Sequence, residues 1–419
     1  MRRHLTYTTV IIAQAVWICG VPTNSPAADP ALKAGAQEQP LMAARANNEF
    51  ACDLYRKAAV REGNLFFSPI SISSVLGMLE SGAKGETKKE IRTVLHLSEA
   101  NQKQPDETSL FCLLDNSGDG YRLKSASRIW GRTGLKINPD FREAIQSHFA
   151  ADFEEVDFTE PNAAVEKIND WVDDKTNGKI SKMLAGPLKD DVQLVAANAI
   201  YFKGNWTHRF DPKATTSQKF FARGQKQMEV PTMALTNNFR YWDSRTLLKV
   251  IELPYEGDVF SAVLLLPTNR DGMPELEKQL TGDNLHKWLS NLDDSVNAKT
   301  KEPPEVIVRL PKFNMSAEMQ LNDVLQQLGI KTAFGPRADL SGIAGEPMYV
   351  SAVIHKAFVQ FDEKGTVATA ATVGVASSSI PPSFVADHPF LILIRDRKSG
   401  AILFLGRVEN PGEEAVASR

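Results

Sequence analysis

The chain has 419 residues, 42% of them hydrophobic and 24% charged, which is a globular composition and excludes disordered, collagenous and coiled-coil proteins. Its formal net charge of −3 leaves no basic excess that would attract nucleic acid or an anionic membrane. Three cysteines are too few for a disulfide scaffold, and the sequence motifs of zinc proteases, phosphate-binding loops and dinucleotide sites are absent.

The beginning of the chain has the architecture of a secretory signal peptide. A short positively charged head precedes an apolar run at residues 10–21, and the small residues Ser25 and Ala27 follow. The apolar run is too short to span a bilayer comfortably, which favours a cleaved signal over a retained membrane anchor. We therefore expect residues 1–27 to be a signal peptide and residues 28–45 a flexible leader. The expected location is secreted or periplasmic.

Helical spacing of apolar residues dominates the first part of the chain after this leader. It extends from about residue 42 to 114, and Ser71 is placed to cap a helix there just after Pro69. A second helical pattern covers residues 161–177, where a proline suits the first turn and Gly178 can end the helix.

Runs typical of strands dominate the rest of the chain. The expected strands are 192–202, 250–253, 260–266, 305–310 and 349–361. A helix with one apolar face is expected at Ser316–Leu328, with Gly329 as its end. The apolar runs Phe390–Ile394 and Ala401–Leu405 flank a polar turn and predict a hairpin buried on both faces.

Helices come mostly first and strands mostly last, without βα alternation, which predicts an α+β fold. No linker or repeat is visible, so we expect one domain at residues 46–411, with 412–419 as a C-terminal tail. Cys52 and Cys112 both lie in apolar, helix-like contexts. Two buried free thiols and one disulfide bridge are equally compatible with that pattern.

A long insert separates the strand that ends near Glu363 from the hairpin that begins near His388. Loops of about twenty residues without a core of their own are uncommon in compact domains and are functional or disordered. Residues 365–380 contain no proline and no charge, and small side chains alternate with a set that is mostly valine. Such a segment could become a strand with one tight and one looser face, and a disordered surface loop is the alternative.

Several separated motifs, in the right order, resemble the serpin family. They are Asn64–Ser71, Asn169–Val172 continuing to Lys175–Ile180, Asn198–Trp206, Leu310–Phe313, Ala338–Ile343, Val353–Phe358, Asp387–Leu391 and Gly406–Val408. Each motif alone is weak, but together and in this order they are highly specific, and the similarity runs from about Ala46 to Pro411. The resemblance implies the serpin fold: a helical N-terminal part, large mixed and antiparallel sheets, and an exposed reactive-centre loop.

In inhibitory serpins this loop serves as bait for a protease, and its first part is the hinge. The matching hinge residues are Glu363, Gly365, Thr366, Ala368, Ala370 and Ala371. Gly365 would let the chain turn into the sheet, and Thr366 would be the first side chain to insert. A charge or a proline at the inserting positions would stall insertion, and none is present. Thr369 departs from the alanine more usual in the family and should lie on the looser face.

The resemblance implies an inhibitor of the suicide-substrate type rather than an enzyme, with a target protease as partner. The protease forms an ester with the cleaved loop, the loop inserts as a new central strand, and the dragged protease cannot deacylate. About ten new ladder hydrogen bonds of roughly 1 kcal/mol each give a drive on the order of 10 kcal/mol. The native fold must then be a kinetic trap.

The resemblance also assigns two structural groups in the central sheet. The polar cluster beneath the sheet, where strands part to admit the loop, comprises Ser68, Ser71, Asn198 and His355. The region of first insertion at the top of the sheet comprises Trp206, Lys312 and Glu363. His355 would be structural, not catalytic. We expect the pair of Lys312 and Glu363 to be exposed and therefore worth at most about 1 kcal/mol.

The bait bond depends on the direction of counting. From the hinge it is Ser379–Ile380, which we favour, whereas backwards from Ile380 and its two following prolines it is Ser378–Ser379. A serine before the cut does not suit a trypsin-like pocket. It favours an elastase-like or subtilisin-like protease, with a papain-like cysteine protease as an alternative target.

Two other classes of function compete with inhibition. A non-inhibitory serpin acting as a carrier or folding helper usually loses the small, uncharged hinge that this chain keeps. A hydrolase would need a nucleophile motif such as G-x-S-x-G, which is absent. Residues 98–120 contain Lys103 as their one basic residue, so no heparin site is expected. We expect a monomer with no cofactor, metal or nucleic-acid partner.

Overall fold

The structure is a computed structural model that describes residues 30–363 and 380–413, apart from residues 61, 98–107, 177, 179, 181, 185, 187–190 and 301. The expected signal peptide lies outside the described residues, as do the hinge from Gly365 to Ala371 and the bait residues Ser378 and Ser379. Within the described part of the chain, no helix is long and apolar enough to cross a membrane.

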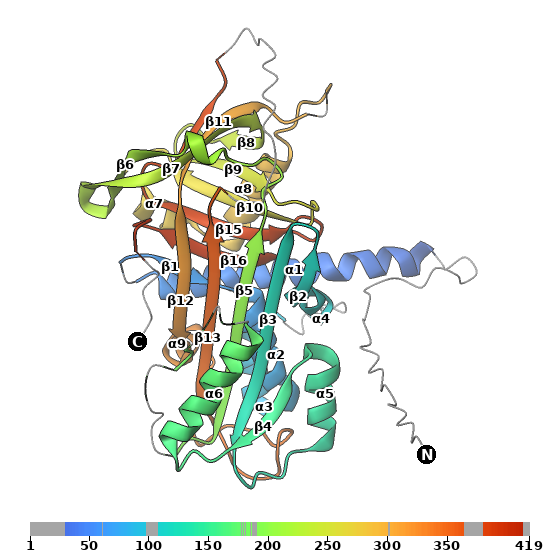
Figure 1. Ribbon diagram of the computed structural model, residues 1–419. Coiled ribbons are helices and arrows are strands. Elements are labelled where there is room, and N and C mark those ends of the chain that lie inside the picture. The colour runs from blue at the N-terminus through green and yellow to red at the C-terminus, as the bar shows by residue number, and fades with distance from the viewer. Residues whose placement is uncertain are drawn as a thin grey trace, which may run out of the picture.

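A mixed central sheet dominates the molecule (Figure 1). Its strand order is β12 (Phe313–Gln320), β13 (Val350–Phe361), β5 (Leu194–Gly204), β3 (Tyr121–Arg132) and β2 (Asp115–Gly118), with β4 (Asp152–Val156) also paired to β3. β13 and β5 run parallel, and so do β3 and β4, whereas the other pairs are antiparallel.

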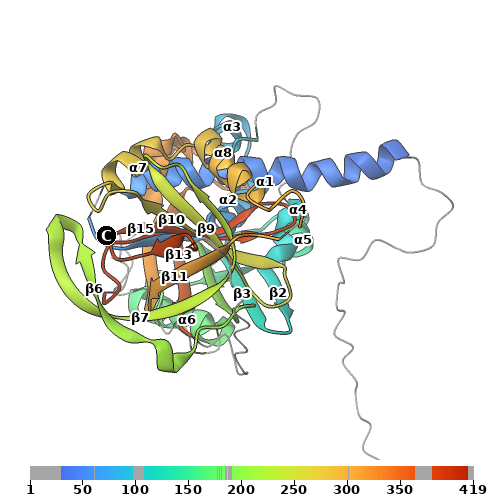
Figure 2. The same cartoon turned by 90° about the horizontal axis from the view of Figure 1, so that it is seen from above.

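Two further sheets pack above the central one in Figure 1. The six-stranded sheet has the order β1 (Leu65–Phe67), β16 (Ile402–Val408), β15 (Phe390–Asp396), β10 (Phe260–Pro267), β9 (Leu248–Pro254) and β8 (Arg240–Asp243). The four-stranded sheet has the order β14 (Ser383–Val385), β11 (Glu305–Pro311), β7 (Lys226–Asn238) and β6 (Thr216–Ala222). Figure 2 shows the hairpin of β6 and β7 curving around the outside of the molecule.

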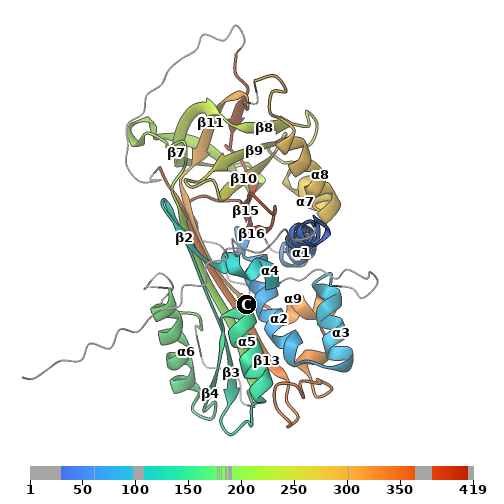
Figure 3. The same ribbon diagram turned by 90° about the vertical axis from the view of Figure 1, so that its right-hand side faces the viewer.

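The helices lie on both faces of the central sheet and beside the six-stranded sheet (Figure 3). They are α1 (Pro30–Ala58), α2 (Pro69–Gly82), α3 (Gly85–Val94), α4 (Thr108–Phe111), α5 (Pro139–Phe149), α6 (Pro161–Lys175), α7 (Met273–Gln279), α8 (Gly282–Asp293) and α9 (Asn322–Leu328). Short 3₁₀ turns lie at Cys112–Leu114, Pro212–Ala214, Arg223–Gln225 and Thr332–Phe334. In side view, α6 lies on one face of the sheet and α2 and α5 on the other (Figure 3).

Helix α2 is buried on nearly all sides, which explains its apolar sequence and fixes the helix beneath the central sheet. Its end is held tightly: the Gly342 N–H donates to the Gly82 carbonyl (3.0 Å), and a Cβ at Gly82 would approach Ile343 to 2.3 Å. Only glycine permits this contact. The start of α2 therefore occupies a defined position under β13 and β5.

Most expected elements are present. The α+β order and the strands expected at 192–202, 250–253, 260–266, 305–310 and 349–361 are confirmed, as is the C-terminal hairpin. β15 and β16 are buried at every position because each has a strand on both sides and covered faces. The helix expected at 161–177 ends at Lys175.

Three sequence-based expectations are wrong. Residues 316–320 belong to strand β12 rather than to a helix, because burial alternates along it against β13. The cap of α2 is Ser68 instead of Ser71: its Oγ accepts from the Ser71 N–H (3.4 Å), with proline in the first turn. The expected leader overlaps α1, in which Ala43 and Ala44 are buried.

The cysteines fit neither of the two alternatives. Cys52 is buried in the core, Cys112 is exposed, and no disulfide joins them. Burial raises the pKa of the Cys52 thiol to about 12, so this sulfur is an unreactive packing group.

Candidate functional site: the seam between β5 and β13 and the loop anchors

The seam is defined here as the pairing of β13 with β5 from Val350–Leu194 to Val359–Phe202. The two strands are direct neighbours in the sheet. After β13 the described chain resumes at Ile380, whose side chain is 93% exposed, and then pairs as β14 with the four-stranded sheet. The predicted loop therefore connects two different sheets and begins at the strand that borders the seam.

Under the seam, His355 connects β13 to the start of α2. Its Nε2 accepts a hydrogen bond from the backbone N–H of Ser68 (2.9 Å), and both residues are fully buried. Ser71 continues the contact: its Oγ lies 3.4 Å from the Oγ of Ser125 on β3. These two hydrogen bonds tie the start of the helix to strands on both sides of the seam.

Asn198, on β5, binds the neighbouring strand rather than β13. Its Nδ2 donates to Ser125 Oγ (2.9 Å) and Ser127 Oγ (2.8 Å), and it also reaches the Ala126 carbonyl. Asn198 and His355 occupy paired positions across the seam, but no side-chain hydrogen bond joins them. The two side chains thus make no direct hydrogen bond across the seam, and the polar link between its two sides passes through the start of α2.

The tautomer of His355 follows from its contact with Ser68. Because Nε2 accepts, the proton lies on Nδ1, and burial lowers the pKa of His355 from 6.5 to about 3, so the ring is neutral. Nδ1–H and the Oδ1 of Asn198 make no hydrogen bond with the described residues. A buried polar group left in this state costs about 1–3 kcal/mol. The closed seam therefore carries a free-energy cost at the place where the family resemblance implies that the strands part.

The neutral His355 gives a prediction for acid pH. The pKa of His355 is lower in the folded state than in the unfolded state. The contribution of this neutral histidine to stability is therefore complete above about pH 6.5, and it is lost by about 1.4 kcal/mol per pH unit as the pH falls towards 3. Between pH 7.5 and 5.0 the wild type should lose about 2 kcal/mol from this group. His355→Gln keeps an acceptor for Ser68 and cannot titrate, so its thermal midpoint should fall less over that range. His286→Gln, at an exposed histidine, serves as the control, and equal pH dependence of H355Q and wild type would contradict the assignment.

At the end of β13, Glu363 anchors the chain before the loop. Its Oε2 lies 2.8 Å from the Lys312 Nζ, and its Oε1 accepts from the Thr215 hydroxyl (2.7 Å). Burial by itself raises the pKa of the Glu363 carboxyl, but these hydrogen bonds outweigh it and hold the pKa below its ordinary value. The expectation of an exposed pair is wrong, because Glu363 is only 7% exposed.

Trp206 holds the neighbouring residue of the same segment. Its Nε1–H donates to the Asp362 carbonyl (2.9 Å), and its ring stacks on Tyr255 with centroids 4.4 Å apart. Phe361 packs against the same indole at 5.9 Å. Trp206 and Lys312 thus both hold residues 362–363: Trp206 binds the backbone carbonyl of Asp362, and Lys312 binds the carboxylate of Glu363.

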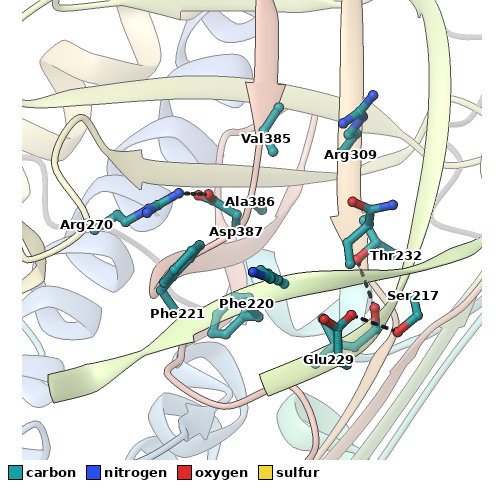
Figure 4. Close-up of a pocket in the computed structure, with 13 residues that line it drawn as sticks. Ser217, Phe220, Phe221, Glu229, Thr232, Arg270, Arg309, Val385, Ala386 and Asp387 are labelled. Carbon is teal, nitrogen blue, oxygen red and sulfur yellow. Dashed lines mark hydrogen bonds and ion pairs between the residues drawn. The ribbon is translucent and has the colours of Figure 1, made fainter. Parts of the chain in front are cut away.

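The other end of the loop is anchored by Asp387, shortly after β14. Figure 4 shows Arg270 directed at this carboxylate, from which its Nη2 lies 2.8 Å. The guanidinium also lies 3.5 Å from the ring centroid of Phe221, whose N–H donates to the Asp387 carbonyl. His388 follows, with Nε2 donating to the Pro267 carbonyl (2.9 Å). The loop therefore starts and ends at fixed points.

Sequence reasoning missed Ser125, Ser127, Thr215 and Arg270 among these residues. Serines on a strand carry no periodic signal of their own, and Thr215 and Arg270 lie in connecting segments. Their roles depend on partners more than forty positions away along the chain.

Comparison with known proteins gives a consistent result. The family model described as Serpin (serine protease inhibitor) matches residues 45–411. Leukocyte elastase inhibitor of Homo sapiens is 37% identical over 382 residues, which cover 87% of this chain and 98% of that protein. Iripin-2 of Ixodes ricinus is 37% identical over 376 residues, covering 87% and 92%.

Solved structures show the same architecture. Uncleaved ovalbumin superposes with a TM-score of 0.77 at 27% identity, covering 88% of this chain and 100% of that one. Human thyroxine-binding globulin complexed with thyroxine has a TM-score of 0.79 at 28% identity, covering 90% and 100%. With the family match over nearly all of its length and with its seam and loop anchors, this chain belongs to the serpin family and has the α+β serpin fold.

Proposed function

We propose that this serpin inhibits a serine protease as a suicide substrate. The observation that carries the proposal is the seam: β5 and β13 are direct neighbours, and β13 leads through the anchored Glu363 into a segment, 365–380, without charge or proline. Small uncharged side chains can enter a sheet and donate to its ladder. The similarity to leukocyte elastase inhibitor supports the same function.

The chemistry uses groups of both proteins. The serine Oγ of the protease attacks the carbonyl carbon of Ser379, the peptide bond to Ile380 breaks, and the new amine of Ile380 leaves with a proton from the general acid of the protease. The loop remains esterified to the protease and inserts between β5 and β13. Distortion of the protease then prevents water from hydrolysing the ester, so the complex persists.

The bait residue indicates the target class. A serine at position 379 fills only a small primary pocket, which favours an elastase-like or subtilisin-like serine protease over a trypsin-like one. The export expected from residues 1–27 fits an extracellular or periplasmic target and forms part of the proposal, as does action as a monomer. The thyroxine binding that the name of thyroxine-binding globulin states is not part of this proposal.

The proposal is tested by incubating the protein with elastase, subtilisin, trypsin and papain and separating the products on denaturing gels. A complex with elastase or subtilisin that survives denaturation supports inhibition of a serine protease. Clean loop cleavage without a complex would show a substrate and contradict the proposal. A stable complex formed with papain alone would move the target to the cysteine class.

Exchange of the bait residue should change the target. Ser379→Arg provides a guanidinium for the buried carboxylate of trypsin-like pockets and is too large for an elastase-like pocket. We expect a covalent complex with trypsin and at least about a tenfold slower reaction with elastase. Ser378→Arg is the matched control, and sequencing the released fragment locates the cut. A new N-terminus at Ser379 instead of Ile380 would assign the bait to Ser378.

A further inference from the structure

We propose that the native protein has a ligand site on the open half of the central sheet, beyond the end of α6, which takes a small aromatic anion. Figure 1 shows α6 crossing the lower half of this sheet face and leaving the upper half of β3, β5 and β13 uncovered by the helix. A cavity of about 440 Å³ lies there, within the usual size of small-molecule sites. It spans the seam and is bounded by Thr176 at the end of α6.

Two cations face this cavity from adjacent strands. Arg122 on β3 and Lys203 on β5 are Cα partners and are both exposed. Like charges at directly opposed positions destabilise a sheet. Neither side chain forms an ion pair or hydrogen bond with any residue that the structure describes. The next cation on the same face of β3, Lys124, has a partner in Asp115 at 2.6 Å. The unpaired charges of Arg122 and Lys203 therefore fit an anion.

An aromatic pair forms the floor beside these cations. Tyr201 on β5 and Phe358 on β13 are Cα partners across the seam, and their rings stack with centroids 5.8 Å apart at 22°. Tyr201 lies two positions before Lys203 and therefore on the same face. Its hydroxyl makes no hydrogen bond with the described residues. Burial raises the pKa of Tyr201, and the nearby charge of Arg122 opposes this rise, which shows that the two groups are close.

The combination defines the chemical class of the ligand. A carboxylate or sulfonate would accept from the guanidinium of Arg122, the ammonium of Lys203 and the hydroxyl of Tyr201. A planar ring attached to it would pack on the half-buried ring of Phe358. Neither part alone uses both features of the cavity, so an aromatic anion should bind better than an inorganic anion or a neutral ring.

The site distinguishes two states of the sheet, an inference that rests on the proposed function. Neighbouring strands lie about 4.8 Å apart, so a strand inserted in the seam would roughly double the separation of β5 and β13 and break the Tyr201–Phe358 pair. A ligand that contacts both rings then binds only the uninserted form. It should slow insertion by about the factor 1 + [L]/Kd, which is about elevenfold at ten times Kd.

The test uses 2-naphthalenesulfonate as the probe, with 2-naphthalenemethanol as the neutral ring and sodium sulfate as the anion without a ring. Binding to the intact full chain is measured by calorimetry. We expect the sulfonate to bind at least about tenfold more tightly than either control compound. The double variant Arg122→Gln, Lys203→Gln should lose at least about tenfold in affinity. Equal binding to this variant and the wild type, or equal binding of sulfate, would overturn the site.

A matched double variant controls for the loss of two charges. Arg245→Gln with Lys278→Gln removes one arginine and one lysine that are exposed and do not line this cavity, and it should bind the sulfonate like the wild type. If this control variant also loses binding, the affinity lost by the Arg122→Gln, Lys203→Gln variant reflects only the change in net charge, which would contradict the proposal. The rate of covalent complex formation with elastase is then measured with and without the probe. Absence of a complex without the probe would refute the proposed function, whereas the calorimetric comparison would still decide the ligand site.

Discussion

Cleavage of the loop at Ser379–Ile380 is expected to raise the thermal midpoint of the protein by about 10–15 °C. Insertion of the cut loop between β5 and β13 adds about ten ladder hydrogen bonds, a gain on the order of 10 kcal/mol, and a chain of this size unfolds with an entropy that converts it into such a shift. It also removes the closed seam, in which Nδ1–H of His355 and Oδ1 of Asn198 are buried without partners among the described residues. An ordinary nick leaves stability unchanged or lowers it.

The measurement is calorimetry before and after verified cleavage by a protease that cuts within the loop. A control keeps the cut and removes insertion: Thr366→Arg, nicked at the same bond, should show little of the increase. An unchanged midpoint in the nicked wild type would exclude insertion, and an equal increase in both proteins would assign the effect to the cut itself.

Thr366→Arg should also turn the inhibitor into a substrate. The residue is expected to be the first side chain to enter the sheet, and a guanidinium buried there without a partner opposes insertion by several kcal/mol. Each 1.4 kcal/mol changes the ratio of trapping to release about tenfold, so the amount of inhibitor needed per protease should rise by about tenfold or more. Cleavage itself should stay fast, because the bait bond is thirteen positions away.

The matched control is Thr369→Arg. It makes the same substitution at a position an odd number of residues away from Thr366. Position 369 is expected on the opposite face of the inserted strand, which near the top of the sheet is not covered by α6 (Figure 3). This variant should remain an inhibitor with a far smaller loss. If T366R traps protease as efficiently as the wild type, the assigned direction of the hinge side chains is wrong.

The elements that could be predicted from the sequence are those whose residue pattern can be interpreted without knowing which other strand or helix packs against them. The apolar runs of β15 and β16 indicate strands buried on both faces wherever they pack. β12 was mistaken for part of a helix because its alternating Met315, Ala317 and Met319 lead directly into the apolar stripe of α9. Only the pairing with β13 separates the two elements.

The residues of the candidate site could be predicted from the family motifs that contain them, and not from the chemical properties of the single residues. His355 and Asn198 carry no signal in isolation, and their assignment depended on the family pattern around them. That the carboxylate of Glu363 is buried, and that Thr215 binds it, follows from a contact across 148 positions, which no local pattern contains. The family motifs name Lys312 and Glu363 as a pair, but the sequence does not tell how far either side chain is exposed to solvent.

The placement of β15 and β16 has a consequence for how cleavage can be observed. A cut at Ser379–Ile380 would leave a 40-residue fragment, 380–419, that contains both of these strands. They occupy the middle of the six-stranded sheet, with β10 on one side and β1 on the other, and every residue in them is buried. Releasing the fragment would expose the core of the whole upper part of the molecule. The cleaved protein should therefore elute from a sizing column as one particle, and only denaturation should reveal that it consists of two chains.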